Sequence, residues 1–114
     1  SPMSYISYQD FDKVNIRVGT VIKVEEYKEL NKPSLRLEID FGKKIGIKKS
    51  SAQLLKYYSS KNIIGKQVIA VINFEKKQIG KFMSEVLILG LPDEENCPVL
   101  LSPDIKLPNG GKLF

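Results

Sequence analysis

The segment Val14-Asn15-Ile16-Arg17-Val18-Gly19-Thr20-Val21-Ile22-Lys23-Val24 constrains the fold more than any other stretch of the chain. Apolar residues and Thr20 occupy the even positions, and most polar residues occupy the odd ones. Alternation with a period of two is typical of a half-buried β-strand. Gly19 lies midway on the more polar face, where a missing side chain permits a bulge or the sharp bend that a small barrel needs. We therefore predict one long strand whose even-numbered face is buried.

The segments that follow repeat this β pattern. Leu35, Leu37, Ile39 and Phe41 alternate with charged residues, which predicts a second half-buried strand. Further strands are expected at 45–49, at 68–72, where nearly every residue is apolar, at 85–89 and at 98–101. Residues 31–33 and 62–65 read as turns, and 73–82 as a polar, hairpin-like loop with Gly80 as its hinge. Short helices are predicted after Ser7, with Asp10 in the capping box, and over 52–58, with Ser50 as the N-cap.

This order of elements predicts a single all-β domain over residues 1–114. Five or six strands with one helix between the third and the fourth match a five-stranded OB-fold barrel. Counting strands alone leaves an SH3-like barrel or a β-sandwich as alternatives. We find no internal repeat and no linker that would divide the chain.

Composition excludes several classes of catalyst. The chain has no histidine and one cysteine, Cys97, which rules out Ser-His or Cys-His nucleophilic catalysis and zinc sites built on those ligands. The acidic pairs Asp10/Asp12 and Glu25/Glu26 give no sign of converging on one pocket. We expect a protein that is not an enzyme and that uses no metal or cofactor.

The same features predict a location in the cell. A lone cysteine permits no intrachain disulfide, which fits a reducing compartment. No apolar run approaches the ~18 residues needed to cross a bilayer, and no signal segment opens the chain. Ser1 and Pro2, ahead of Met3, resemble a cloning remnant. We expect a cytoplasmic protein without membrane insertion.

Positive charge is concentrated in the middle of the chain. Residues 42–82 contain ten lysines against one acid, Glu75, a net charge of +9 in a chain whose total is +5. Such a segment is typical of a surface that meets an anionic partner. A solvated, lysine-rich face without a ligand explains it equally well. The only two arginines, Arg17 and Arg36, are expected to pair with acids across the sheet, for example with Glu38.

Two candidate binding regions lie within this segment. Lys48, Lys49, Ser50 and Ser51 are expected at a strand end that enters a helix, where free amides and lysines favour an anion. The second region is the 73–84 loop, in which basic residues alternate with apolar and aromatic ones: Asn73, Phe74, Lys76, Lys77, Ile79, Lys81, Phe82, Met83 and Ser84. Exposed rings with lysines suit stacked bases, whereas Phe74, Ile79, Phe82 and Met83 suit the apolar side chains of an extended polypeptide. The alternative is that Ile79 and Phe82 only pack the loop onto the barrel.

Several stretches, taken in order, resemble one family. Val14–Val21 is similar to the opening strand of the tRNA-binding-domain family, which occurs as free dimers and as appendages of aminoacyl-tRNA synthetases. Its CsaA branch is indicated by the stretches at 39–42, 45–53, 67–74, 78–80, 84–90 and 107–112. Where tRNA-binding members usually read Ser-Glu-Gly-Met, this chain has Ser84-Glu85-Val86-Leu87, as CsaA proteins do. The 74–78 loop departs from that branch because it lacks prolines.

The resemblance implies a fold, partners and an assembly. It implies an OB-fold homodimer in which the terminal regions 5–11 and 103–114 help to build the interface. It also implies an export-related chaperone that binds unfolded or precursor polypeptides passively and is linked to the secretion machinery. The wider family implies tRNA binding by shape as the alternative.

Overall fold

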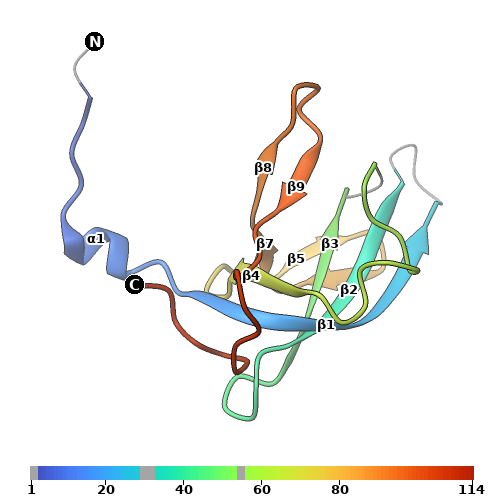
Figure 1. Cartoon of the computed structure of the whole chain (residues 1–114), viewed down its shortest axis with the longest axis horizontal. Coiled ribbons are helices and arrows are strands. Elements are labelled where there is room, and N and C mark those ends of the chain that lie inside the picture. The colour runs from blue at the N-terminus through green and yellow to red at the C-terminus, as the bar shows by residue number, and fades with distance from the viewer. Residues whose placement is uncertain (1–2, 29–32, 54–55) are drawn as a thin grey trace.

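The computed structural model describes residues 3–28, 33–53 and 56–114 and is almost entirely β-structure (Figure 1). Its elements, in chain order, are α1 (Tyr8–Asp12), β1 (Ile16–Tyr27), β2 (Ser34–Asp40), β3 (Ile47–Ala52), β4 (Gln67–Val71), β5 (Lys77–Ile79), β6 (Phe82–Ser84), β7 (Leu87–Ile88), β8 (Gly90–Pro92) and β9 (Pro98–Leu100). A five-stranded antiparallel sheet has the order β3-β2-β1-β4-β7. β5–β6 and β8–β9 form two separate hairpins.

The five-stranded sheet curls so that its two ends meet, as an OB-fold requires. At one edge, the carbonyl oxygen of Lys49 in β3 accepts hydrogen bonds from the backbone amides of Glu85 (2.8 Å) and Val86 (3.2 Å). These two residues directly precede β7, the strand at the opposite edge of the sheet. The predicted all-β OB-fold is confirmed.

The interior of the barrel is apolar, and its buried apolar side chains come mainly from β1, β2, β4 and β7. Leu35, Leu37 and Ile39 of β2 are fully buried, so the predicted alternation of this strand is confirmed. Facing them are the other members of the buried cluster: Val21, Phe41, Ile63, Val68, Ala70, Val86 and Ile88. β4 is buried along nearly its whole length, as predicted for a strand covered on both faces.

β1 is the predicted long strand, but its even-numbered residues face the interior only beyond residue 22, where Val24 packs against the core. The register with β2 shifts between Val21 and Lys23, so Ile22 is the extra residue of a bulge and remains 42% exposed. Before the bulge, Gly19 and Val21 face the core. A Cβ on Gly19 would lie 2.7 Å from side-chain carbons of both Ile39 and Phe41. The glycine is thus required by close packing, and the bulge lies three residues later.

The C-terminal segment covers the other side of β1. The backbone of Val18 exchanges hydrogen bonds with Gly111 (3.1 Å) and Gly110 (2.8 Å). Thr20 donates its hydroxyl hydrogen to Asn109 Oδ1 at 2.7 Å. The alternating pattern of β1 therefore reflects two buried faces: one in the barrel and one under residues 107–113.

The third strand begins two residues later than predicted and extends through the expected helix start. Lys48, Lys49, Ser50 and Ser51 all lie within β3, paired with Ile39 to Arg36 of β2. Ser50 lies opposite Leu37 on the inner side and is buried, and its hydroxyl donates to the carbonyl of Val86 at 2.9 Å. Its hydroxyl therefore caps no helix. The helix predicted over 52–58 is wrong for the described residues of that range; 54 and 55 lie outside them.

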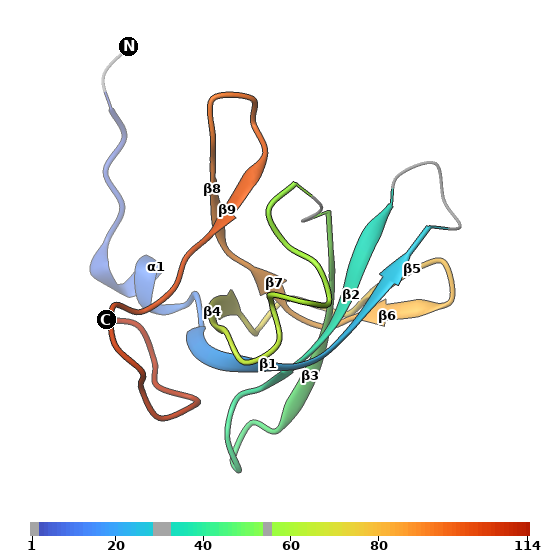
Figure 2. The same cartoon turned by 45° about the vertical axis from the view of Figure 1, so that its right-hand side comes forward.

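The chain begins with an arm that projects from the barrel. α1 starts where predicted, with Ser7 Oγ accepting a hydrogen bond from the Asp10 amide at 3.0 Å. Residues 3–7 run away from the sheet in both views (Figures 1 and 2). The turn predicted at 31–33 falls largely outside the described residues. Among the described residues, no helix has the length and apolarity to span a bilayer.

Candidate functional site

The β5–β6 hairpin lies across one end of β3 and covers one side of a groove. Side chains directly opposite each other in an antiparallel pair point to the same face. Lys77/Ser84 and Ile79/Phe82 therefore share one face, and Gln78/Met83 share the other. The first set turns toward the barrel, where Ile79, Phe82 and Ser84 are partly buried; Met83 is exposed. Gly80, at the tip, has a φ of +61° that suits the predicted hinge.

The groove has a volume of about 520 Å³ and apolar walls. Phe74 and Leu87, which line the same hollow, are 58% and 50% exposed and so present apolar surface to a ligand. Ile79 and Val86 complete the apolar surface. The polar residues at its rim are Ser51, Glu75, Lys77, Ser84 and Glu85.

Polar contacts fix the base of the hairpin to β3. Ser84 Oγ accepts a hydrogen bond from the Ser51 amide, and Glu85 Oε1 accepts one from the Lys49 amide, both at 3.1 Å. Lys76 Nζ lies 3.7 Å from Glu85 Oε2. Three of the predicted site residues, Lys49, Ser51 and Ser84, thus use backbone or hydroxyl groups to position the groove.

Aromatic stacking holds the tip of the hairpin. The guanidinium carbon of Arg36 lies 3.3 Å from the ring centre of Tyr27 and 4.9 Å from that of Phe82. Its Nε and Nη2 atoms are buried and find no hydrogen-bond partner among the described residues. A buried donor without a partner costs about 1–3 kcal/mol. Stacking on two rings offsets part of this cost, since a desolvated cation–π contact contributes about 2 kcal/mol.

The arginines therefore do not make the predicted pairs with acids. Within the described residues, Arg36 forms no ion pair with Glu38, whose partner is Lys23 at 3.6 Å. Arg17 donates to Asn15 Oδ1 at 2.7 Å and to the carbonyl of Gly110 at 2.9 Å. Both arginines hold one segment of the chain against another.

The structure divides the predicted site residues into three sets. Five line the groove: Ser51, Phe74, Lys77, Ile79 and Ser84. Lys49 and Phe82 border a smaller, charged hollow of about 180 Å³ beside Arg36. The others lie apart: Lys48 is on β3, Ser50 is buried, Lys76 and Lys81 are exposed, and Met83 points away from the barrel. Asn73 Oδ1 and Nδ2 bond to the backbone of Asn15 and Lys13, which fixes the start of β1.

Sequence reasoning missed four groove residues: Glu75, Glu85, Val86 and Leu87. Val86 and Leu87 were assigned to an ordinary strand, and Glu75 was noted only for its charge. No local signal in the sequence links residues 85–87 to the hairpin, and only the folded chain places them in the same groove.

Comparison with known proteins places this architecture in a family. The family model described as "Putative tRNA binding domain" matches residues 16–112. The chain belongs to this family. A methionine–tRNA ligase of Pyrococcus horikoshii is 33% identical over 111 residues, which are 97% of this chain and 15% of that protein. The chain thus spans only about 15% of the length of such curated relatives.

Solved structures of two CsaA proteins match this chain over their whole length. The chaperone CsaA from Bacillus anthracis str. Ames is 46% identical, with a TM-score of 0.90, and the match covers 97% of this chain and 100% of that one. The CsaA chaperone protein from Picrophilus torridus is 45% identical, with a TM-score of 0.86, over 96% and 100%. The predicted similarity to CsaA is confirmed.

A second apolar hollow of this tRNA-binding domain lies beneath its C-terminal segment. Its volume is about 670 Å³, and its walls include Val18, Ile69, Leu107, Leu113 and Phe114. Phe114 is fully exposed, and so is most of Tyr5 in the N-terminal arm. Both termini therefore present apolar side chains that the barrel itself does not bury.

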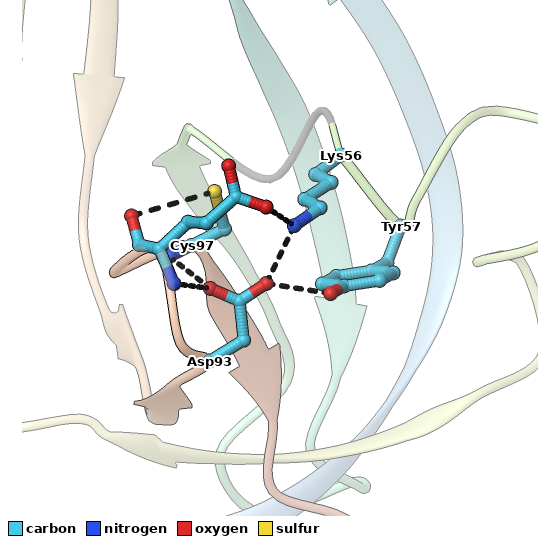
Figure 3. A network of polar contacts seen from close by, with 5 residues as sticks. Lys56, Tyr57, Asp93 and Cys97 are labelled. Carbon is cyan, nitrogen blue, oxygen red and sulfur yellow. Dashed lines mark hydrogen bonds and ion pairs between the residues drawn. The ribbon is translucent and has the colours of Figure 1, made fainter.

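Lys56, Tyr57, Asp93 and Glu95 form a cluster of hydrogen bonds and ion pairs that has a structural role (Figure 3). Lys56 Nζ donates to Asp93 Oδ2 (2.8 Å) and Glu95 Oε1 (2.9 Å), and the Tyr57 hydroxyl donates to Asp93. The hydrogen bonds from Lys56 and Tyr57 lower the pKa of Asp93, and the bonds to Asp93 and Glu95 raise the pKa of Lys56. The hydrogen bond from the Tyr57 hydroxyl to Asp93 likewise raises the pKa of Tyr57.

All three shifts oppose proton transfer near neutral pH. Asp93 stays ionised, Lys56 stays protonated, and Tyr57 keeps its hydrogen, so the cluster offers neither a general acid nor a base. Its contacts instead join the β8–β9 hairpin to residues 56 and 57. No group of three or more Cys, Asp or Glu residues in the described part of the chain is arranged to hold a metal ion.

Proposed function

We propose that this protein is a CsaA-like chaperone that binds unfolded or precursor polypeptides in the groove beneath the β5–β6 hairpin. The observation that carries the proposal is the apolar wall formed by Phe74, Ile79 and Leu87 in a chain that is 46% identical to a CsaA chaperone. Its expected role is related to protein export, in the cytoplasm and in contact with the secretion machinery.

The groove has the chemistry of a permissive peptide site. An extended polypeptide places alternate side chains on opposite sides, so apolar residues can enter the groove while others stay in solvent. Exposed Phe74 and Leu87 give the apolar contact area, and the charges of Lys77 and Glu75 lie at the rim. The sequence contains no P-loop, and we infer passive holding without a nucleotide.

The second candidate function is structure-selective tRNA binding. The description of the matching family and the net charge of +9 over residues 42–82 favour it. Lysines 76, 77 and 81 on the hairpin are exposed, and Lys77 lines the same hollow as Phe74. Lysines that neutralise phosphates release counterions, so this function has a characteristic dependence on salt.

The first experiment compares the two ligands across a salt series. A labelled peptide from the N-terminal region of a secretory precursor and bulk tRNA are titrated with the purified protein. We expect peptide affinity to change little with salt, because apolar burial dominates. RNA affinity should fall by roughly 0.7–0.9 log units per phosphate contact for each log unit of salt. Tight, salt-dependent tRNA binding without peptide binding would replace the first proposal by the second.

We also propose that the protein is a homodimer joined through its terminal segments. The hollow beneath residues 107–114 is apolar, and the arm at residues 3–7 projects from its own barrel with Met3, Tyr5 and Ile6 exposed. Each copy supplies both an arm and a hollow, so across a two-fold axis the arm of one copy can fill the hollow of the other.

Analytical ultracentrifugation tests this assembly. We expect a species of twice the 12.9 kDa chain mass at micromolar concentration. Deleting residues 1–7 should shift the sample toward monomer while the barrel stays folded, because the arm makes no core contact in its own chain. A monomer mass for the unaltered protein would contradict the homodimer.

A further inference from the structure

The tip of the β5–β6 hairpin is held differently from its base. At the base, hydrogen bonds join Ser84 and Glu85 to β3. At the tip, the contact is the ring of Phe82 near the Arg36 guanidinium, which also lies against the ring of Tyr27. A Cβ built on Gly80 would lie 3.8 Å from Arg36 Nη2, which places the turn directly over this side chain.

The position of the tip determines the shape of the groove. Ile79 is paired with Phe82 across the hairpin and shares its barrel-facing side, and Ile79 lines the groove. Any movement that lifts Phe82 from Arg36 therefore moves Ile79 as well. The stack and the groove are coupled through one cross-strand pair.

The closed position of the tip also carries a solvation cost. Arg36 Nε and Nη2 have no hydrogen-bond partner among the described residues, so the closed position leaves two donors unsatisfied. Lifting the tip admits water to both donors. Stacking thus favours the closed position of the tip, and solvation of the two donors favours the open one. A site that admits varied polypeptides requires such a balance.

We propose that the Tyr27–Arg36–Phe82 stack is a latch that sets the position of the β5–β6 hairpin, and that Arg36 is a positioning residue for polypeptide binding. This inference rests on the proposed function. Arg36 touches neither the groove nor its contents: it acts through Phe82 and Ile79. Charge alone is insufficient, because the planar guanidinium stacks on aromatic rings, here those of Tyr27 and Phe82, and a lysine ammonium has no plane to stack.

The test combines hydrogen exchange with peptide titration. In Arg36→Met, backbone amides of residues 77–84 should exchange roughly thirtyfold faster in the free protein, the change expected for losing a desolvated cation–π contact. Amides of β1 and β4 should be unchanged. Affinity for the precursor peptide should fall by a similar factor. Arg36→Lys should behave like Arg36→Met, since it lacks the planar group.

Two controls keep the outcomes distinct. Lys61→Met removes the same charge from an exposed loop position and should leave both exchange and binding unchanged. If Arg36→Met fails to fold, Phe82→Leu removes the stack from the hairpin side, with the same expected results. Unchanged exchange at residues 77–84, or wild-type behaviour of Arg36→Lys, would overturn the latch. Faster exchange with unaltered peptide affinity would overturn the positioning role.

The exchange data also separate this inference from the proposed function. A wild-type protein that binds no precursor peptide would remove the proposed function, and with it the positioning role of Arg36. Exchange at the hairpin in the same samples would still show whether the stack holds the tip. Failure of the proposed function and failure of the latch therefore give different experimental results.

Discussion

Phe74→Asp is expected to weaken binding of a precursor peptide by about a hundredfold, or ~3 kcal/mol. Phe74 is 58% exposed in the free protein and forms part of the apolar wall of the groove. The substitution removes an aromatic contact and places a charge where apolar side chains would be buried. Isothermal titration measures the affinity, and thermal melting should show little change because Phe74 lies outside the core.

Met83→Asp is the matched control for this variant. Met83 is 38% exposed and lies on the face of the hairpin that points away from the barrel. The same charge introduced there should change peptide affinity by less than about threefold, or ~0.7 kcal/mol. Equal losses in the two variants would indicate that charge on the hairpin matters and that the groove does not hold the peptide.

Ile63→Ala is expected to lower the free energy of unfolding by about 2–5 kcal/mol. Ile63 is fully buried in the barrel cluster, where its loss leaves a cavity among well-packed side chains. Total stabilities of small domains are about 5–15 kcal/mol, so the loss is a large share. Urea unfolding measures the change at fixed protein concentration, since the proposed dimer would make stability depend on concentration.

The neighbouring residue supplies the control for this measurement. Ile64 has the same side chain and is 55% exposed, so Ile64→Ala should cost less than about 1 kcal/mol. A similar loss for both variants would contradict the assignment of Ile63 alone to the core.

The two isoleucines also show where sequence patterns stop being informative. Residues 62–65 read as a turn, and nothing in Asn62-Ile63-Ile64-Gly65 distinguishes the buried isoleucine from the exposed one. The structure contains this turn, and a hydrogen bond of 2.8 Å from the amide of Gly65 to the carbonyl of Val21 joins it to β1. That contact joins residues far apart in the chain and determines which side chain enters the barrel.

The candidate site was predictable in composition and only partly in geometry. The hairpin, its Gly80 hinge and the neighbourhood of Phe74, Lys77 and Ile79 follow from local pattern. Which of its residues face the groove depends on the pairing of β5 with β6, and this places Phe82 on Arg36 and Met83 in solvent. The other wall comes from residues 85–87, which no local signal links to the hairpin.

The sequence by itself determined the all-β class, the order of the main strands and the family, because alternation and short motifs are local properties of the chain. Tertiary structure decided which face of β1 is buried at each position. The bulge at Ile22 reverses the inward face of β1, and the C-terminal segment buries the side that alternation alone assigns to the core. Ser50 became a strand residue and not a helix cap, because pairing with β2 and the bond to Val86 outweigh a local capping preference. Burial and pairing are summed over distant segments, so only the folded chain fixes them.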